Sequence, residues 1–242
     1  MPTDKVGFLI VKPKCTACII EDLCEYSPQK SKDKTCYQLM ILIPICKLIS
    51  LTYNLVPIYS SGTIIMSDIL LVFGTDTGNT EEAGEKIQAK FAEAGHFVEL
   101  VNVTDCTIDQ INQADICIFG IPTWDFGGIQ GDWEDYEDTL KEADLAGKMV
   151  AFYGLGDQFG YGDYFIDAVG WLHEIVEPMG AIIKGYWPTE SYDFQDSRAL
   201  SDCKTYFYGL AIDEDQQFEL SDQRIEQWVD QLLAEFSLDE AA

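Results

Sequence analysis

Residues 69–80 read ILLVFGTDTGNT, an apolar run that passes directly into a short polar turn. The run ILLVFG is typical of a parallel strand that is buried on both faces. A helix is predicted after the turn, because Ala83, Ile87 and Phe91 recur four residues apart and would share one face. Glu81 and Glu82 fall in its first turn, where the helix dipole favours acidic side chains. The stretch therefore predicts a strand, a polar turn and a helix, the repeating unit of an α/β protein.

The same alternation continues toward the C-terminus. Apolar runs predict four more strands, at residues 97–101, 115–120, 148–154 and 181–185. Helical spacing predicts helices at residues 133–143, at 164–178 and from 221 onward, with Trp133 and Trp228 in the core. This rhythm predicts a parallel sheet covered by helices on both faces. Such sheets bind ligands beyond the carboxyl ends of their strands, so the candidate site is formed by the loops after Gly74, Gly120 and Gly154.

The first loop, residues 75–80, places three threonine hydroxyls and a run of backbone amides at the start of a helix. Such groups bind a phosphate through hydrogen bonds alone. The loop is not a P-loop, because Asn79 stands where that motif requires a lysine. An ordinary turn with threonine caps is the alternative interpretation. The candidate phosphate ligands are Thr75, Asp76, Thr77, Gly78, Asn79 and Thr80.

The other two loops each carry an aromatic side chain. Trp124 follows Pro122 and Thr123, just past a buried strand, where its ring is able to stack on a flat ligand. Tyr161 lies in a glycine-rich loop, residues 154–163, whose backbone allows a ligand to approach closely. A core tryptophan and an exposed loop tyrosine are the alternatives. A phosphate site together with two rings on separate loops predicts FMN as the ligand.

These three motifs together resemble the flavodoxin family. The phosphate loop T-x-T-G-x-T, the P-T-W loop and the G-x-G-D-Q-x-G-Y loop occur in that family's order and spacing, and the resemblance covers residues 67–236. The runs GIPTWDFG, YGLGDQFGYG and GYWPTESYDF are most similar to the second flavodoxin of enteric and related bacteria. The resemblance implies a three-layer, doubly wound, five-stranded parallel sheet of order 2-1-3-4-5. An insertion in the fifth strand, at about residues 186–206, is similar to that of the long-chain class.

The resemblance also assigns roles to residues. Residues 75–80 would hold the phosphate of non-covalently bound FMN, and Trp124 and Tyr161 would stack on the two faces of its ring. Asp125 stands where long-chain members often have Asn, near flavin N5, and this difference bears on how the reduced flavin is stabilised. The remaining expected cofactor ligands are Pro122, Thr123, Gly127, Gly156, Asp157 and Asp163.

Charge predicts the kind of partner. The chain has 42 acidic and 15 basic residues, a net charge of −27, and 37 of the acidic residues lie after residue 65. So acidic a body repels nucleic acid and anionic membrane surfaces and favours proteins with basic surfaces. The resemblance implies that these partners are a flavodoxin reductase and acceptor redox enzymes. We expect the protein itself to be a monomer. The alternative is that the acidity serves solubility alone.

Residues 1–65 differ from the rest. They contain five of the eight cysteines, but Cys15 and Cys18 form the only C-x-x-C pair and no histidine accompanies them, so a metal site has little support. The apolar segment 39–59 is interrupted by Pro44, Lys47 and Pro57 and does not read as a membrane span. We expect an N-terminal extension of uncertain structure at 1–65, which need not belong to the natural mature protein, followed by an FMN-binding domain at 66–242.

The predicted function is that of a low-potential, one-electron carrier in the cytoplasm. The three cysteines of the body are scattered, and Cys117 is expected to be a buried free thiol, as in a reducing compartment. No catalytic triad, Cys–His pair, paired carboxylates or metal-ligand cluster is evident at the crevice, so no catalytic residue is predicted. Two alternatives remain: an FMN-dependent NAD(P)H:quinone reductase of the same fold, and an acidic binding module that has lost its flavin.

Overall fold

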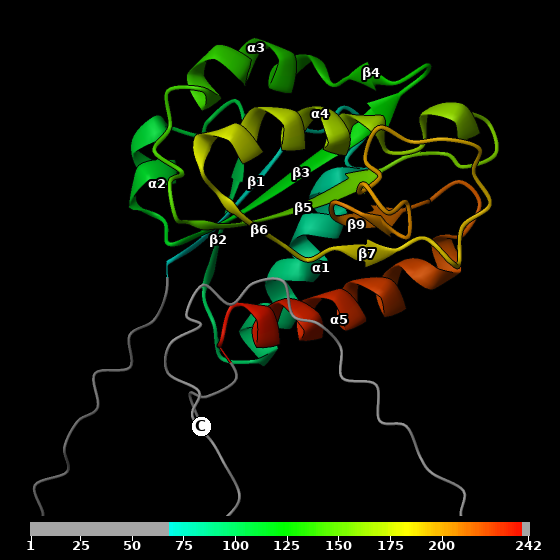
Figure 1. The fold of residues 1–242 in the computed structure, drawn as a ribbon. Coiled ribbons are helices and arrows are strands. Elements are labelled where there is room, and N and C mark those ends of the chain that lie inside the picture. Colours follow the sequence, from blue (N-terminus) through cyan, green and yellow to red (C-terminus); the bar gives the residue numbers. More distant parts are fainter. Residues whose placement is uncertain (1–67, 239–242) are drawn as a thin grey trace, which may run out of the picture. The chain divides into compact units, whose positions relative to one another are not determined.

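The computed structural model describes residues 68–238, which form an α/β sandwich around one central sheet (Figure 1). Its parallel strands are β1 (Ile69–Phe73), β2 (Val98–Asn102), β3 (Ile116–Trp124), β5 (Met149–Leu155) and β6 (Ile182–Lys184). They lie side by side in the order β2-β1-β3-β5-β6. The predicted order 2-1-3-4-5 is therefore confirmed, and each predicted strand lies within a few residues of its predicted position.

Helices cover both faces of the sheet, as predicted. α1 (Asn79–Glu93) and α5 (Phe218–Glu235) pack together on one face, and α3 (Gly131–Leu140) and α4 (Asp167–Val176) lie on the other (Figure 1). A short helix that the sequence analysis did not identify, α2 (Ile108–Gln113), follows β2. Its start is a capping box, in which Thr107 Oγ1 accepts from the amide of Gln110 and Gln110 Oε1 accepts from the amide of Thr107.

The fifth strand is divided into two parts. β6 pairs with the first half of β5, where Met149 aligns with Ile182, and β9 (Leu210–Ile212) pairs with the second half, where Tyr153 aligns with Leu210. The chain between them contains a small hairpin of β7 (Trp187–Pro188) and β8 (Tyr206–Phe207). The predicted insertion in the fifth strand is thus confirmed, and it brings the chain back to the same edge of the sheet.

Two predicted segments differ in detail from the structure. β3 continues through Pro122 to Trp124 and turns back into β4 (Gly128–Ile129), so this predicted loop is a strand end followed by a tight hairpin. The helix predicted at 164–178 is three pieces: η1 (Gly162–Tyr164), α4 and η2 (Glu177–Met179). Ile166 has a left-handed backbone, with φ at 51°, and this residue separates η1 from α4. Pro178 lies in the first turn of η2, where its missing N–H removes no helical hydrogen bond.

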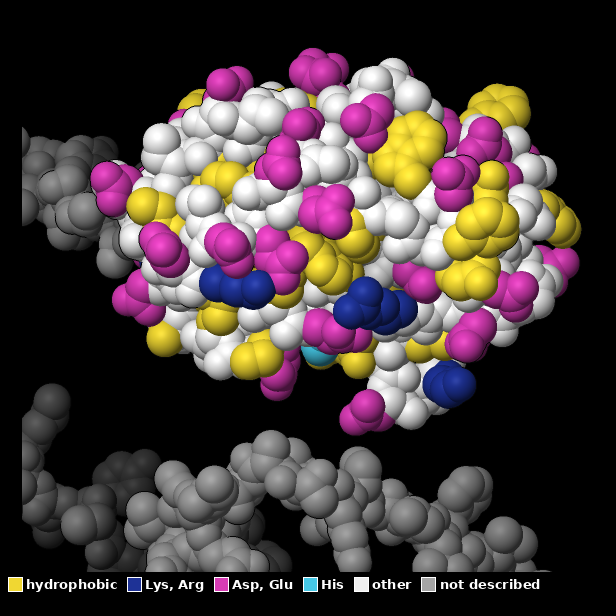
Figure 2. Space-filling view, turned by 90° about the horizontal axis from the view of Figure 1, so that it is seen from above, with side chains coloured by type: hydrophobic (Ala, Val, Ile, Leu, Met, Phe, Trp, Pro, Cys, Tyr) yellow, Lys and Arg dark blue, Asp and Glu magenta, His cyan; other side chains and the backbone are white. Residues whose placement is uncertain are grey.

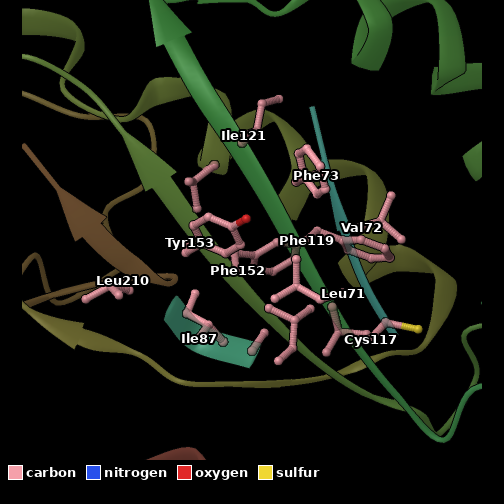
Figure 3. Packing of buried hydrophobic residues seen from close by; sticks show 14 of the residues in the cluster. Leu71, Val72, Phe73, Ile87, Cys117, Phe119, Ile121, Phe152, Tyr153 and Leu210 are labelled. Carbon is pink, nitrogen blue, oxygen red and sulfur yellow. The ribbon is translucent and has the colours of Figure 1, made fainter. Parts of the chain in front are cut away.

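The core lies between the sheet and its helices, and one tyrosine crosses it. Tyr153, on β5, is fully buried among the apolar residues shown in Figure 3, and its hydroxyl donates to the carbonyl of Thr80 in the first turn of α1 at 2.9 Å. The ring needs two glycines: a Cβ at Gly120 would lie 2.1 Å from Tyr153 Cζ, and one at Gly84 2.8 Å from its oxygen. Tyr153 therefore ties the sheet to the start of α1.

Several predictions about single residues are also confirmed. Trp133 and Trp228 are fully buried, and their indole nitrogens donate to the carbonyls of Gly120 and Gly185 at 2.9 and 2.8 Å. Cys117 is a buried free thiol. The candidate metal cysteines and the apolar segment 39–59 lie outside the described residues. Between residues 68 and 238, no helix is both long and apolar enough for a membrane span.

Candidate functional site

A cavity of about 320 Å³ opens at the carboxyl ends of β1, β3 and β5, where the sequence placed the site. Its volume falls in the range that proteins use for small molecules and cofactors. All three predicted loops contribute to its wall, and a fourth loop, after β9, joins them. Ten of the fifteen predicted ligands line it: Thr77, Asn79, Thr80, Pro122, Thr123, Trp124, Asp125, Gly156, Asp157 and Tyr161.

The first wall is the N-terminus of α1. Gly78 occupies the position before the helix with φ at 93°, a left-handed conformation that glycine adopts without strain, and no side chain caps the helix. The amides of the first turn have no carbonyl partner within the helix, and they point outward at its positive end. Thr75 Oγ1 accepts from the amide of Gly78 at 3.0 Å, so this threonine shapes the turn. The wall is suited to a phosphate.

Trp124 forms the second wall at the end of β3. The residue is 37% exposed, and its Nε1 donates to Asp76 Oδ2 at 2.7 Å. Asp76 also accepts from Nε2 of the buried Gln130 at 3.3 Å. Asp76 is therefore occupied by two donors and does not line the cavity; it connects the phosphate-binding loop to the tryptophan. The structure presents Trp124 as a partly open face beside the cavity, which excludes the core alternative.

Tyr161 forms the third wall, on the loop after β5. Its hydroxyl donates to Asp125 Oδ1 at 3.1 Å, and this hydrogen bond raises the pKa of Tyr161 above its usual value. Asp125 has a left-handed backbone with φ at 42°, which Asp and Asn tolerate better than most residues. Phe126 packs edge-on against Tyr161, with ring centroids 5.7 Å apart. The two predicted stacking residues thus come from separate loops that meet at one cavity.

Five predicted ligands do not line the cavity: Thr75, Asp76, Gly78, Gly127 and Asp163. The first three shape or brace the α1 turn, as described above. Gly127 has φ at 83° in the hairpin between β3 and β4, where a Cβ would also lie 2.9 Å from Asp167 Oδ2. Asp163 is exposed in η1.

Three lining residues were missed by the sequence analysis: Leu155, Glu214 and Asp215. Leu155 ends β5, and the two acidic residues follow β9 after one intervening residue, Asp213. The run LAI before them was a recognisable apolar signal, but a three-residue strand after a long insertion is too short to stand out. Burial, Asp157 and Asp213 together raise the pKa of Asp215. The lining therefore holds four carboxylates and no lysine or arginine.

A family model described as Flavodoxin matches residues 71–228, which span the sheet and the whole cavity. The chain belongs to the flavodoxin family. It is 47% identical to the flavodoxin of Picosynechococcus sp. over 173 residues, which are 72% of this chain and all of that protein. It is 46% identical to flavodoxin 2 of Escherichia coli over 167 residues, 69% of this chain and 95% of that protein. The divided fifth strand marks this flavodoxin as a long-chain member.

A solved flavodoxin shares the architecture. The flavodoxin of Fusobacterium nucleatum, bound to flavin mononucleotide, superposes with a TM-score of 0.65 at 27% identity, covering 70% of this chain and 99% of that one. The doubly wound flavodoxin fold read from the sequence is therefore confirmed both by topology and by comparison.

Proposed function

We propose that this flavodoxin is a low-potential, one-electron carrier that binds one FMN non-covalently. A single observation carries the proposal: Trp124 and Tyr161 face one cavity whose other wall is the uncapped N-terminus of α1. The Fusobacterium relative binds flavin mononucleotide. FMN supplies the one-electron chemistry, and the protein supplies the binding, the orientation and the electrostatics.

The chain's own groups fit the two ends of this cofactor. The free amides of the α1 first turn and the hydroxyls of Thr77 and Thr80 are donors for a phosphomonoester, and the helix dipole favours its negative charge. The site binds without a cation, because no lysine or arginine is among its lining residues. Trp124 and Tyr161 offer apolar faces that keep water away from a flat ring.

The acidic lining sets the direction of the reduction potential. Asp125, Asp157, Glu214 and Asp215 place negative charge at the cavity. Carboxylates repel additional negative charge on a reduced ring, so they lower the potential and make the protein a stronger reductant. The two aromatic walls act in the same direction, since they exclude the water that would otherwise stabilise that charge.

The acidic surface supports the proposal that the partners are redox proteins with basic surfaces. The electron donor would be a flavodoxin reductase, and the acceptors would be redox enzymes. Figure 2 shows acidic side chains spread over the face that carries α3 and α4, with few basic ones among them. A partner with complementary charge would be steered toward the protein at low salt. We propose a monomer that acts in the cytoplasm without substrate turnover of its own. The rate of reduction by a basic reductase should fall steeply as ionic strength rises.

The proposed cofactor domain is residues 66–242, preceded by an extension at residues 1–65. The match to the flavodoxin family model begins at residue 71, after that extension. The intact mass of the protein isolated from its natural source tests this division. A mass that includes the first 65 residues would show that they belong to the mature protein, and a mass without them would show that they do not.

A titration of the purified protein with FMN, followed by stepwise reduction, tests the function. We expect quenching of FMN fluorescence at one equivalent and two separate one-electron steps in the visible spectrum. NADPH added alone should leave the flavin oxidised; bleaching would favour the quinone-reductase alternative. A protein that takes up no FMN would refute the proposal.

A further inference from the structure

Asp213 is a buried carboxylate directly after β9 that has no basic partner in the part of the chain that the structure describes. It is 0% exposed, and none of the ion pairs formed between residues 68 and 238 includes it. Burying a charge without a counter-ion is costly unless hydrogen bonds replace the lost water. An apolar residue, like Ile212 directly before it, would suit the core better than a carboxylate. The groups that donate hydrogen bonds to Asp213 therefore indicate what this charge does.

Four N–H groups supply those hydrogen bonds, and they come from two loops. Oδ2 accepts from the amide of Gln158 at 3.1 Å and from its Nε2 at 2.7 Å. Oδ1 accepts from the amides of Asp215 and Gln216 at 3.1 and 2.9 Å. Hydrogen bonds to an ionised acceptor are stronger than neutral ones and strict in geometry. One carboxylate thus joins the loop after β5 to the loop after β9.

Gln158 extends this connection to the insertion. Its side chain is also 0% exposed, and its Oε1 accepts from the amide of Asp193 at 2.6 Å. Hydrogen bonds at both ends fix the orientation of this side-chain amide. Its oxygen accepts from the amide of Asp193, and its nitrogen donates to the carboxylate of Asp213. A further bond from Gln216 Nε2 to Asp157 Oδ1, at 3.3 Å, joins the same two loops at the cavity edge.

Both loops carry residues that line the cavity. Asp157 precedes Gln158, and Tyr161 follows it by three residues; Glu214 and Asp215 follow Asp213 directly. We propose that Asp213 and Gln158 are positioning residues, which hold the stacking tyrosine and the acidic wall in place for the flavin and connect them to the long-chain insertion. They do not touch the cavity themselves. This inference rests on the proposed function, because its readout is flavin binding.

Exchanging the carboxylate of Asp213 and the amide of Gln158 between the two positions tests this pair. In Asp213→Asn, the new amide nitrogen faces two N–H groups of Gln158, so donors oppose donors. In Gln158→Glu, two carboxylates face each other in a buried site. The double variant, Asp213→Asn with Gln158→Glu, places an amide nitrogen against a carboxylate again and keeps an acceptor for the amide of Asp193. The backbone amide of residue 158 still faces that nitrogen, so one of the two bonds across the pair is restored.

The test is an FMN titration of the full chain, with the visible circular dichroism of the bound flavin as a second readout. We expect each single variant to raise the Kd for FMN by about 10- to 100-fold and to alter the flavin's dichroic signal. The double variant should bind FMN more tightly than either single variant and recover part of the signal, because only the side-chain bond across the pair is restored. Asp202→Asn, the same chemical change at an exposed position of the insertion, is the matched control and should behave as the wild type.

Three results would overturn the inference. The first is wild-type FMN affinity and dichroism in both single variants, even if they unfold more readily on heating. The second is a double variant as weak as the singles. If the single variants do not fold, Gln158→Met replaces them, because it keeps the side-chain length and removes only the side-chain hydrogen bonds. Unchanged FMN affinity in Gln158→Met is the third result. A wild-type chain that takes up no FMN would refute the proposed function as well.

Discussion

The indole nitrogen of Trp124 donates to Oδ2 of Asp76 at 2.7 Å, across 48 positions of sequence. The bond joins the end of β3 to the turn that begins α1. Because Asp76 also accepts from the buried Gln130, the carboxylate is held in place and in turn holds the ring. The aromatic wall and the phosphate-binding turn therefore form one unit, in which the orientation of one depends on the other.

Substitution of Trp124 should separate stacking from positioning. Trp124→Ala removes the aromatic face and should weaken FMN binding by about 1–3 kcal/mol, roughly 5- to 150-fold in Kd. Trp124→Phe retains a ring but loses the donor to Asp76, so its loss should be smaller. Fluorescence titration with FMN measures both. Equal affinity for Trp124→Ala and wild type would show that this ring does not stack on the flavin.

Gly120 and Tyr153 should be coupled in stability. A methyl group at Gly120 would collide with Cζ, Cε1 and the oxygen of Tyr153, so Gly120→Ala should destabilise the protein by about 1–3 kcal/mol or more. In a Tyr153→Leu background these atoms are absent, and the same glycine change should cost much less. Urea unfolding of the four proteins gives the coupling energy. Additive effects would argue against the collision.

Long apolar runs allowed the central strands, their order and the site at their carboxyl ends to be predicted. The central strands β1, β3 and β5 are buried on both faces along most of their length, so burial alone determines their pattern and few alternatives compete. The three loops could be interpreted for the same reason: each follows a strand whose end was already located. Trp124, Asp125 and Tyr161 therefore meet at one cavity as expected.

Residues whose roles depend on distant partners could not be predicted. The side chain of Asp76 is held by a hydrogen bond from Trp124 rather than by a group of its own turn. The side chain of Asp213 is held in the same way by Gln158, which lies 55 positions away in the sequence. The sequence between them contains no spacing that signals such a bond. Glu214 and Asp215 were missed because the strand before them has only three residues and resumes a sheet position left at Lys184.

Cys203 should be the most reactive of the three cysteines within the described residues. Hydrogen bonds from Ser201 and Thr205 lower its pKa to about 7, whereas burial raises the pKa of Cys117 to about 12. Since the thiolate is the reactive form, alkylation of Cys203 should reach half its maximal rate near pH 7. Peptide mass spectrometry after timed iodoacetamide treatment measures this. Ser201→Ala with Thr205→Val should shift the profile to higher pH.

Asp125→Asn should lower the pKa of Tyr161. The hydrogen bond to Asp125 raises that pKa above 10.0, so any stability from the bond is complete below pH 10.0 and is lost as the pH rises through the higher value. The difference in stability between wild type and variant should therefore vanish in strong alkali. Carbon-13 NMR of labelled tyrosine rings reports the titration. An unchanged pKa in Asp125→Asn would show that the Asp125 carboxylate does not raise the pKa of Tyr161 in solution.

Asp157 and Asp215 should each lower the potential of the second one-electron step. A carboxylate about 12 Å from the reduced ring, in an effective dielectric near 40, contributes about 0.7 kcal/mol, or about 30 mV. Asp157→Asn and Asp215→Asn should each raise the potential by roughly this amount, and the double variant by about the sum. Asp230→Asn, on the exposed side of α5, should leave it unchanged.

The effect of Asp215 on the potential should depend on pH. Burial, together with Asp157 and Asp213, raises the pKa of Asp215 above 3.8, so this group takes up its proton at a higher pH than an unperturbed aspartate. Its charge then disappears, and the wild-type potential should become less negative through that range. Asp215→Asn lacks the titrating group, so that part of the slope should be missing. Potentiometric titration at several pH values measures it, and an identical slope in the variant would exclude Asp215 as its source.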